Sequence, residues 1–211
     1  MVKSIFAGVL LVFLCVSASP AQEPGCRQID QWVKEHKATL PGNYDEFVAS
    51  PSLYRRAIFA ALPADVQGKL WIAQLEKYRA DHPELNADQL SVVQDALDLL
   101  VSPDFFAIRP GTVLWKARVS RPLSELRKSA EAAFGRDAAQ AVFGQLGGTP
   151  EGAFELTRAG GLPVKATPPC NCSQVSDYCG SGTFCAAITC VRQTGCGTLW
   201  RYACDGLCAF P

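Results

Sequence analysis

The sequence is poor in the residues and motifs that most enzymes use for catalysis. It has two histidines, His36 and His82, so few general bases are present. It contains no G-x-S-x-G, H-E-x-x-H, phosphate-binding loop or dinucleotide-binding fingerprint. Cys26 and His36 stand ten residues apart, but a spacing alone fixes no catalytic geometry. We therefore expect no enzymatic activity and no cofactor.

The charge balance and the scarcity of long apolar runs exclude two further classes. The chain has 20 Lys and Arg against 20 Asp and Glu, so it has no basic excess of the kind that marks nucleic-acid-binding proteins. After the first 21 residues, no apolar run approaches the ~20 residues that a transmembrane helix needs. We expect no nucleic acid as a partner and no stable transmembrane span. The sequence does not indicate an oligomeric state.

Residues 1–21 have the pattern of a secretory signal peptide. Lys3 precedes an uncharged apolar stretch over residues 5–16, and small residues follow this stretch. We expect cleavage between Ala21 and Gln22, and a product that is secreted and extracellular.

The cysteines are concentrated in one segment. Of the ten, Cys26 stands alone, and eight fall within residues 170–208. A dense, even set in an exported chain is typical of a disulfide framework, because the compartment is oxidising and so short a segment cannot bury a sufficient core. Four disulfides are expected among Cys170, Cys172, Cys179, Cys185, Cys190, Cys196, Cys204 and Cys208. Their pairing stays open, although a bond between Cys170 and Cys172 would close a strained ring.

Zinc binding is the alternative for the same cysteines. The C-x-C at 170–172 and the C-x-x-x-C at 204–208 have spacings within metal-ligand reach. Structural zinc sites usually pair C-x-x-C motifs, however, and an exported chain meets oxidants before it can form a stable thiolate site. We therefore favour disulfides and expect no metal. Cys26 is expected to be free or bonded between chains.

Residues 22–146 are predicted to form a mostly helical domain. The clearest helix covers 86–101, where leucines and valines repeat at three and four residues and Asn86 with Gln89 forms the pattern of a capping box. Other helices are predicted over 51–62 and 63–80, from Arg121-Pro122 onward, and over 136–146. Residues 112–119 alternate between apolar and polar side chains, which predicts a strand.

Glycine and proline interrupt residues 147–169, which is typical of an exposed linker. The pairs Gly147-Gly148 and Gly160-Gly161 are candidate processing sites in it. The predicted organisation is thus a helical domain that serves as a pro-region or carrier, a linker, and a small disulfide-rich module of loops and strands over 170–211. We expect few contacts across the linker, and we expect the helical domain to fold alone.

Cysteines, aromatic residues and glycine turns of the tail follow a specific pattern, at Cys170-Asn171-Cys172-Ser173, 176–179, 183–185, Cys190, 194–198, Trp200, Tyr202 and Cys204-Asp205-Gly206. With this pattern the tail resembles the fulvocin C family of bacteriocins. The tail departs from the family where its last two cysteines stand on either side of Asp205-Gly206. The helical part also resembles longer fulvocin-related precursors, at Leu40-Pro41, residues 54–59 and Leu70-Trp71.

The resemblance implies an antibacterial peptide that is made within a larger exported precursor. Charged residues in the tail are few, so it is unlike cationic peptides that collect on anionic lipid; they are Asp177, Arg192, Arg201 and Asp205. We expect the module to recognise a component of the bacterial envelope through exposed aromatic side chains, which are Tyr178, Phe184, Trp200 and Tyr202. Alternatively, each of these rings packs over the disulfides.

A different class of protein is the second hypothesis for the whole chain. In this reading the module is not toxic, and it attaches the helical domain to a cell-wall polymer or to a partner protein. An enzyme with its site in the helical domain is a third hypothesis, but no motif supports it.

Overall fold

The computed structural model describes residues 26–148 and 167–211. We call the first range the helical body and the second the cysteine-rich module. The predicted signal peptide, its cleavage site at Ala21 and Gln22, and the pair Gly160-Gly161 lie outside the described residues. So does the side chain of Cys26, although its backbone opens the first helix.

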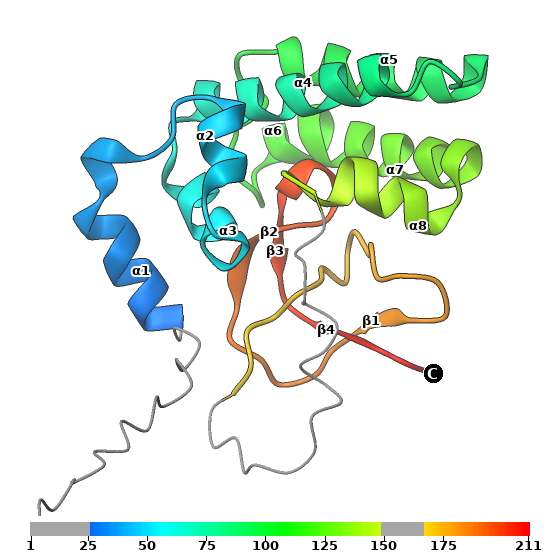
Figure 1. Cartoon of the computed structure of the whole chain (residues 1–211). Helices are drawn as coiled ribbons and strands as arrows, with labels where there is room; N and C mark the ends of the chain where they lie inside the picture. The colour runs from blue at the N-terminus through cyan, green and yellow to red at the C-terminus, as the bar shows by residue number, and fades with distance from the viewer. Residues whose placement is uncertain (1–25, 149–166) are drawn as a thin grey trace, which may run out of the picture.

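The helical body is built from short and medium helices joined by tight turns (Figure 1). They are α1 (Cys26–Glu35), η1 (Lys37–Thr39), α2 (Tyr44–Ala49), α3 (Ser52–Ala61), α4 (Ala64–Asp81), α5 (Ala87–Val101), α6 (Val113–Trp115), η2 (Lys116–Ser120), α7 (Arg121–Phe134), α8 (Arg136–Ala139) and η3 (Gln140–Gly144). The mostly helical character predicted from the sequence is confirmed.

Local sequence signals account for where the main helices begin. The side chain of Asn86 accepts a hydrogen bond from the Gln89 backbone, and the Gln89 side chain accepts one from the Asn86 backbone, which completes the capping box before α5. Helix α7 has Pro122 in its first turn, where the missing N–H costs nothing. Helices α3 and α4 begin directly after a proline, since Pro51 and Pro63 are their N-cap residues.

The strand predicted over residues 112–119 was wrong. This segment forms α6 and the π-helical turn η2, which lead directly into α7. The Thr112 side chain caps the start by accepting a hydrogen bond from the Trp115 backbone. Trp115 and Val119 are both buried, whereas Val113 is 90% exposed. A helix explains this pattern, because residues four apart share a face, and the alternation in the sequence concealed that spacing.

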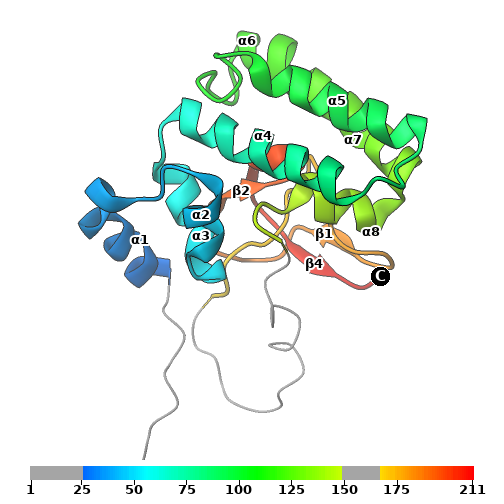
Figure 2. The same ribbon diagram turned by 45° about the horizontal axis from the view of Figure 1, so that its top comes forward.

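Helices α4, α5 and α7 form the centre of the body, since α5 packs against both of the others (Figures 1 and 2). Helix α8 and turn η3 continue beside α7, while α1, α2 and α3 lie at the other end of α4. The apolar residues of these elements form one buried cluster. Among the described residues, no helix is both long enough and apolar enough to span a membrane.

The cysteine-rich module has two short antiparallel strand pairs. Strand β1 (Phe184–Ala186) pairs with β4 (Leu207–Ala209), and β2 (Gln193–Cys196) pairs with β3 (Tyr202–Cys204). The short helical turn η5 (Thr198–Trp200) joins β2 to β3. In Figure 1, this hairpin rises from the module into the helical body. The predicted fold class, a helical region followed by a small disulfide-rich module of loops and strands, is confirmed.

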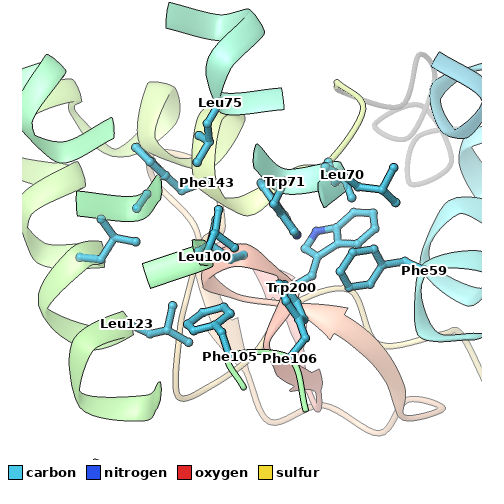
Figure 3. Close-up of a cluster of buried hydrophobic side chains, with 14 of the residues drawn as sticks. Phe59, Leu70, Trp71, Leu75, Leu100, Phe105, Phe106, Leu123, Phe143 and Trp200 are labelled. Carbon is cyan, nitrogen blue, oxygen red and sulfur yellow. The ribbon is translucent and has the colours of Figure 1, made fainter. Parts of the chain in front are cut away.

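The helical body and the cysteine-rich module share one hydrophobic core. Tyr178, Leu199 and Trp200 of the module are buried in the same cluster as the apolar residues of α3, α4, α5 and α7. Figure 3 shows Trp200 beside Trp71 and Phe59, deep among the side chains of the body. The expectation that few contacts would join the two parts was therefore wrong.

Candidate functional site

Four disulfides hold the module together. They pair all eight tail cysteines as Cys170–Cys190, Cys172–Cys185, Cys179–Cys208 and Cys196–Cys204. The Cys172–Cys185 bridge is nested within the Cys170–Cys190 bridge, Cys179–Cys208 crosses both along the chain, and the fourth bridge closes the β2–β3 hairpin. Closing loops in this way lowers the entropy of the unfolded chain, and it compensates for a module whose own buried cluster holds only Cys170, Cys196 and Cys204.

Two of the disulfides lie against each other. The sulfur atoms of Cys172, Cys179 and Cys185 all lie within 4.8 Å of one another. Each sulfur is already bonded in a disulfide, so the cysteines offer no thiolate to a metal. Gly206 passes close to this pair of bridges, since a Cβ there would lie 2.7 Å from the Cys185 sulfur and 2.5 Å from the Ala186 carbonyl oxygen.

The segment between β2 and β3, residues 197–201, is the part of the module that enters the helical body, and we call it the Trp200 loop. Its backbone is unusual, because Leu199 and Trp200 have positive φ angles of 52° and 54°. Residues other than glycine rarely adopt this conformation, which costs each about 1–2 kcal/mol. Burial of the two side chains offsets this cost, since Leu199 is fully buried and Trp200 is 8% exposed.

The Trp200 ring lies in a socket of three aromatic rings of the body: Phe47, Phe59 and Trp71. The ring centroids lie 6.4, 5.3 and 6.1 Å away, and each pair meets edge to face. The indole Nε1 donates a hydrogen bond of 2.9 Å to the Gly144 carbonyl oxygen. The socket therefore buries the apolar surface of the ring and also provides a hydrogen-bond acceptor for its one polar atom.

Arg201 fills a neighbouring cage that is formed by Phe105, Phe106 and Trp115 (Figure 3 labels the two phenylalanines). Its guanidinium carbon lies 5.5, 5.0 and 4.7 Å from the three ring centroids, which is cation–π geometry. Nη2 donates a hydrogen bond of 2.7 Å to the Ile108 carbonyl oxygen. Burial lowers the pKa of Arg201 to about 10, so the group is still charged at neutral pH.

A second arginine, Arg56 on α3, lies over the Trp200 ring. Its guanidinium carbon is 5.8 Å from the centroid of the Trp200 ring, and burial lowers its pKa to about 10. Within residues 26–148 and 167–211, neither Arg56 nor Arg201 forms an ion pair with a carboxylate. The two cations thus rely on aromatic rings and on few polar atoms.

Polar contacts surround these buried anchors. Arg136 forms an ion pair of 2.9 Å with Asp177 and donates a hydrogen bond to the Cys179 carbonyl oxygen. The Asp137 carboxylate accepts hydrogen bonds from the Ser181 hydroxyl and backbone, each 2.7 Å long. These bonds to the charged form lower the pKa of Asp137. We call these polar contacts, made by Arg136 and Asp137 with Asp177, Cys179 and Ser181, the rim. They fix the orientation of the module on the body.

The four aromatic residues predicted as an exposed recognition surface do not form one in the intact chain. Trp200 is 8% exposed and Tyr178 is 6% exposed, whereas Tyr202 is half-buried and Phe184 is 45% exposed. Tyr178 packs on Gly144, where a Cβ would lie 3.1 Å from the Tyr178 ring. Burial raises the pKa of Tyr178. The exposure predicted for Tyr178 and Trp200 was wrong, because both rings pack into the helical body.

Gly147, the first residue of the pair Gly147-Gly148, is bound to the helical body through its backbone. The Gly147 backbone N–H donates to the Gln74 side chain, and its carbonyl oxygen accepts from Arg55, each bond measuring 2.6 Å. Gly148 is exposed. The role of either pair of glycines in processing stays a prediction.

Sequence reasoning missed the residues that form the interface on the side of the body. Phe47 and Phe105 were not singled out, Phe59 was placed only on a predicted helix, and neither Leu199 nor Arg201 was expected to contact the body. One signal was present in the composition: the module has large aromatic residues but too few other apolar side chains to cover them. Such rings need a core supplied from elsewhere.

The module belongs to the class of small domains that disulfides stabilise. The chain is 52% identical over 40 residues to the bacteriocin fulvocin-C of Myxococcus fulvus, a match that covers 18% of this chain and 89% of that protein. Through this bacteriocin-related region the chain belongs to the family of fulvocin-C. No family model matches the chain, and no solved structure matches it.

Proposed function

We propose that this protein is a secreted, bacteriocin-like antibacterial protein in which the cysteine-rich module is the effector. The observation that carries the proposal is the match to fulvocin-C, which extends over 89% of that bacteriocin at 52% identity. A segment equivalent to nearly the whole of a known bacteriocin is thus contained in a much longer chain. The helical body is the additional part, and its proposed role is that of a pro-region or carrier.

The disulfides support this proposal, because an effector must keep its shape outside the cell. Four bridges in one short module suit an oxidising compartment and resist the loss of structure that a small core would otherwise allow. This arrangement agrees with secretion. The proposed partner is a component of the bacterial envelope.

The surface of the module suggests how such a partner is contacted. Large apolar side chains that are exposed on the module are Val175, Phe184, Ile188, Val191 and Phe210. Of the four charges in the tail, Asp177 is paired with Arg136 and Arg201 lies in the aromatic cage. The accessible face is therefore mainly uncharged, and it favours recognition by shape and apolar contact over attraction to anionic lipid.

Growth inhibition of a panel of related bacteria tests the proposal. The samples are the oxidised peptide 162–211, the same peptide after reduction and alkylation, and the segment 22–146. We expect inhibition by the oxidised peptide alone, because its conformation depends on the four bridges. Equal potency before and after reduction, or activity only in segment 22–146, would refute the assignment.

A second candidate function is a non-toxic module that attaches the body to a wall polymer or a partner protein. The shared core favours it, because two parts that are packed together suit a permanent unit. Mass spectrometry of the secreted material, with and without reductant, separates the candidates. If the medium contains only intact protein, attachment is supported. A released peptide of about the last 40 to 50 residues would support a bacteriocin, because fulvocin-C is of similar length.

A further inference from the structure

We propose that the helical body is a binding partner of the cysteine-rich module, which it holds by the Trp200 loop and keeps covered. The two parts are then expected to stay bound after the chain is cut between Gly148 and Thr167, and the loop is exposed only when they separate. The covering role rests on the proposed function of the module as an effector. The binding itself does not depend on that function.

The first argument is the close match between consecutive residues of the loop and separate features of the body. Trp200 enters the socket of Phe47, Phe59 and Trp71, and the next residue, Arg201, enters the cage of three other rings. Each also donates one hydrogen bond to a backbone carbonyl of the body. Trp and Arg are the residue types that most often dominate the energetics of protein interfaces, and here Trp200 is buried and Arg201 half-buried.

The second argument is the charge of Arg201. Burying a cation without a carboxylate is unfavourable, and an apolar side chain of similar size would fill the same space without that penalty. The aromatic cage and the Ile108 carbonyl oxygen offset this penalty only when the module is bound in the position that places the guanidinium inside the cage. The guanidinium therefore favours one mode of binding, as expected of a recognition contact.

The third argument is the conformation of the loop. Leu199 and Trp200 keep their left-handed backbone while their side chains are buried in the body. Within the module, the loop is held by backbone hydrogen bonds from Trp200 to Gly197 and from Arg201 to Thr198. The module has no apolar core that would keep Leu199 and Trp200 buried, since its own buried cluster consists of cysteines. Separation should therefore allow the loop to relax and expose Leu199 and Trp200. The free module then carries an apolar surface that the intact chain hides.

The test uses the full chain with a site-specific protease sequence inserted between Gly148 and Thr167. After cleavage under oxidising conditions, size-exclusion chromatography with light scattering measures whether the two fragments elute together as concentration falls. We expect a 1:1 complex that persists into the nanomolar range. Separation of the cut wild-type chain at micromolar concentration would overturn the inference.

Variants identify the contact that holds the complex. Trp200→Ala is expected to weaken association at least ~100-fold, because it removes the central anchor. Phe210→Ala is the matched control, because Phe210 is an aromatic residue of the same tail that is 73% exposed, and no change is expected. Equal affinities of these two variants would overturn the role of the Trp200 loop.

A rim variant keeps the test decisive if Trp200→Ala does not fold. Arg136→Gln removes the ion pair with Asp177 and leaves the buried anchors intact. We expect a loss of affinity of about 3- to 10-fold, which is larger at low salt than at high salt. Unchanged affinity at low salt would contradict the proposed orientation of the module.

Growth inhibition by the same samples tests the covering role. We expect the separated module to inhibit growth more strongly than the cut complex. A complex as potent as the free module would overturn the covering role. A stable complex together with an inactive free module would instead refute the proposed antibacterial function, while the binding result would stand.

Discussion

The helical body and the cysteine-rich module are stabilised in opposite ways. The body buries a large set of aliphatic and aromatic side chains between helices, and none of the four disulfides lies in it. The module has four disulfides, but its own buried cluster holds cysteines alone. Its large side chains, Leu199 and Trp200, are buried in the body instead. Two parts of a chain that differ sharply in composition can therefore still share one hydrophobic core.

This contrast can be tested first by removing the disulfides. Reduction should unfold the module, because each bridge contributes about 2–4 kcal/mol and little other core is available to it. The body should keep much of its helix but melt at a lower temperature, because the Trp200 anchor is lost. Circular dichroism during thermal unfolding, with and without reductant, measures both effects. An unchanged melting temperature would contradict the shared core.

The next largest effect is expected from Trp200→Ala in the uncut chain. Trp200 is buried among Phe47, Phe59 and Trp71, so its removal should lower the free energy of unfolding by about 3–5 kcal/mol. Phe210→Ala should change it by less than about 0.5 kcal/mol, because that ring is mostly exposed. Urea denaturation followed by circular dichroism gives both values. A similar small change in the two variants would restore the view of two independent parts.

A smaller effect, confined to the module, is expected from Gly206→Ala. The new Cβ would lie 2.5 Å from the Ala186 carbonyl oxygen, so the backbone must shift, at a cost of about 1–3 kcal/mol. Gly42→Ala is the control in the body, because no atom lies within 4 Å of its Cβ position. The same urea measurement compares them. Equal stabilities would argue against the close packing of Gly206 on the Cys172–Cys185 bridge.

Local signals made much of the fold predictable. Asn86 and Gln89 marked the start of α5, and Pro122 marked the first turn of α7, because caps and prolines act on their own neighbours in the sequence. The four disulfides followed from an even, dense set of cysteines, although their pairing did not. The strand prediction for residues 112–119 failed because Trp115 and Val119 are four residues apart, a spacing that fits both the two-residue repeat of a strand and one face of a helix.

The interface could not be predicted in the same way, because its partners are far apart in the sequence. Trp200 meets Trp71 and Phe59, and Arg201 meets Trp115, and no local pattern connects such residues. Amphipathic spacing indicates which face of a helix is buried, but it does not say what covers that face. Tyr178 and Trp200 were therefore assigned to a surface, although both belong to the shared core.

The Trp200 loop also sets an order of folding. Contacts between residues more than a hundred positions apart, such as Trp71 with Trp200, form slowly because a long stretch of chain must be closed first. During synthesis the helices emerge well before the residue that fills the space between them. The β2–β3 hairpin that presents this residue is closed by the Cys196–Cys204 disulfide, which forms only where oxidants are present. The packing of the body is then completed only in an oxidising compartment, and a chain held in a reducing compartment would stay loosely packed.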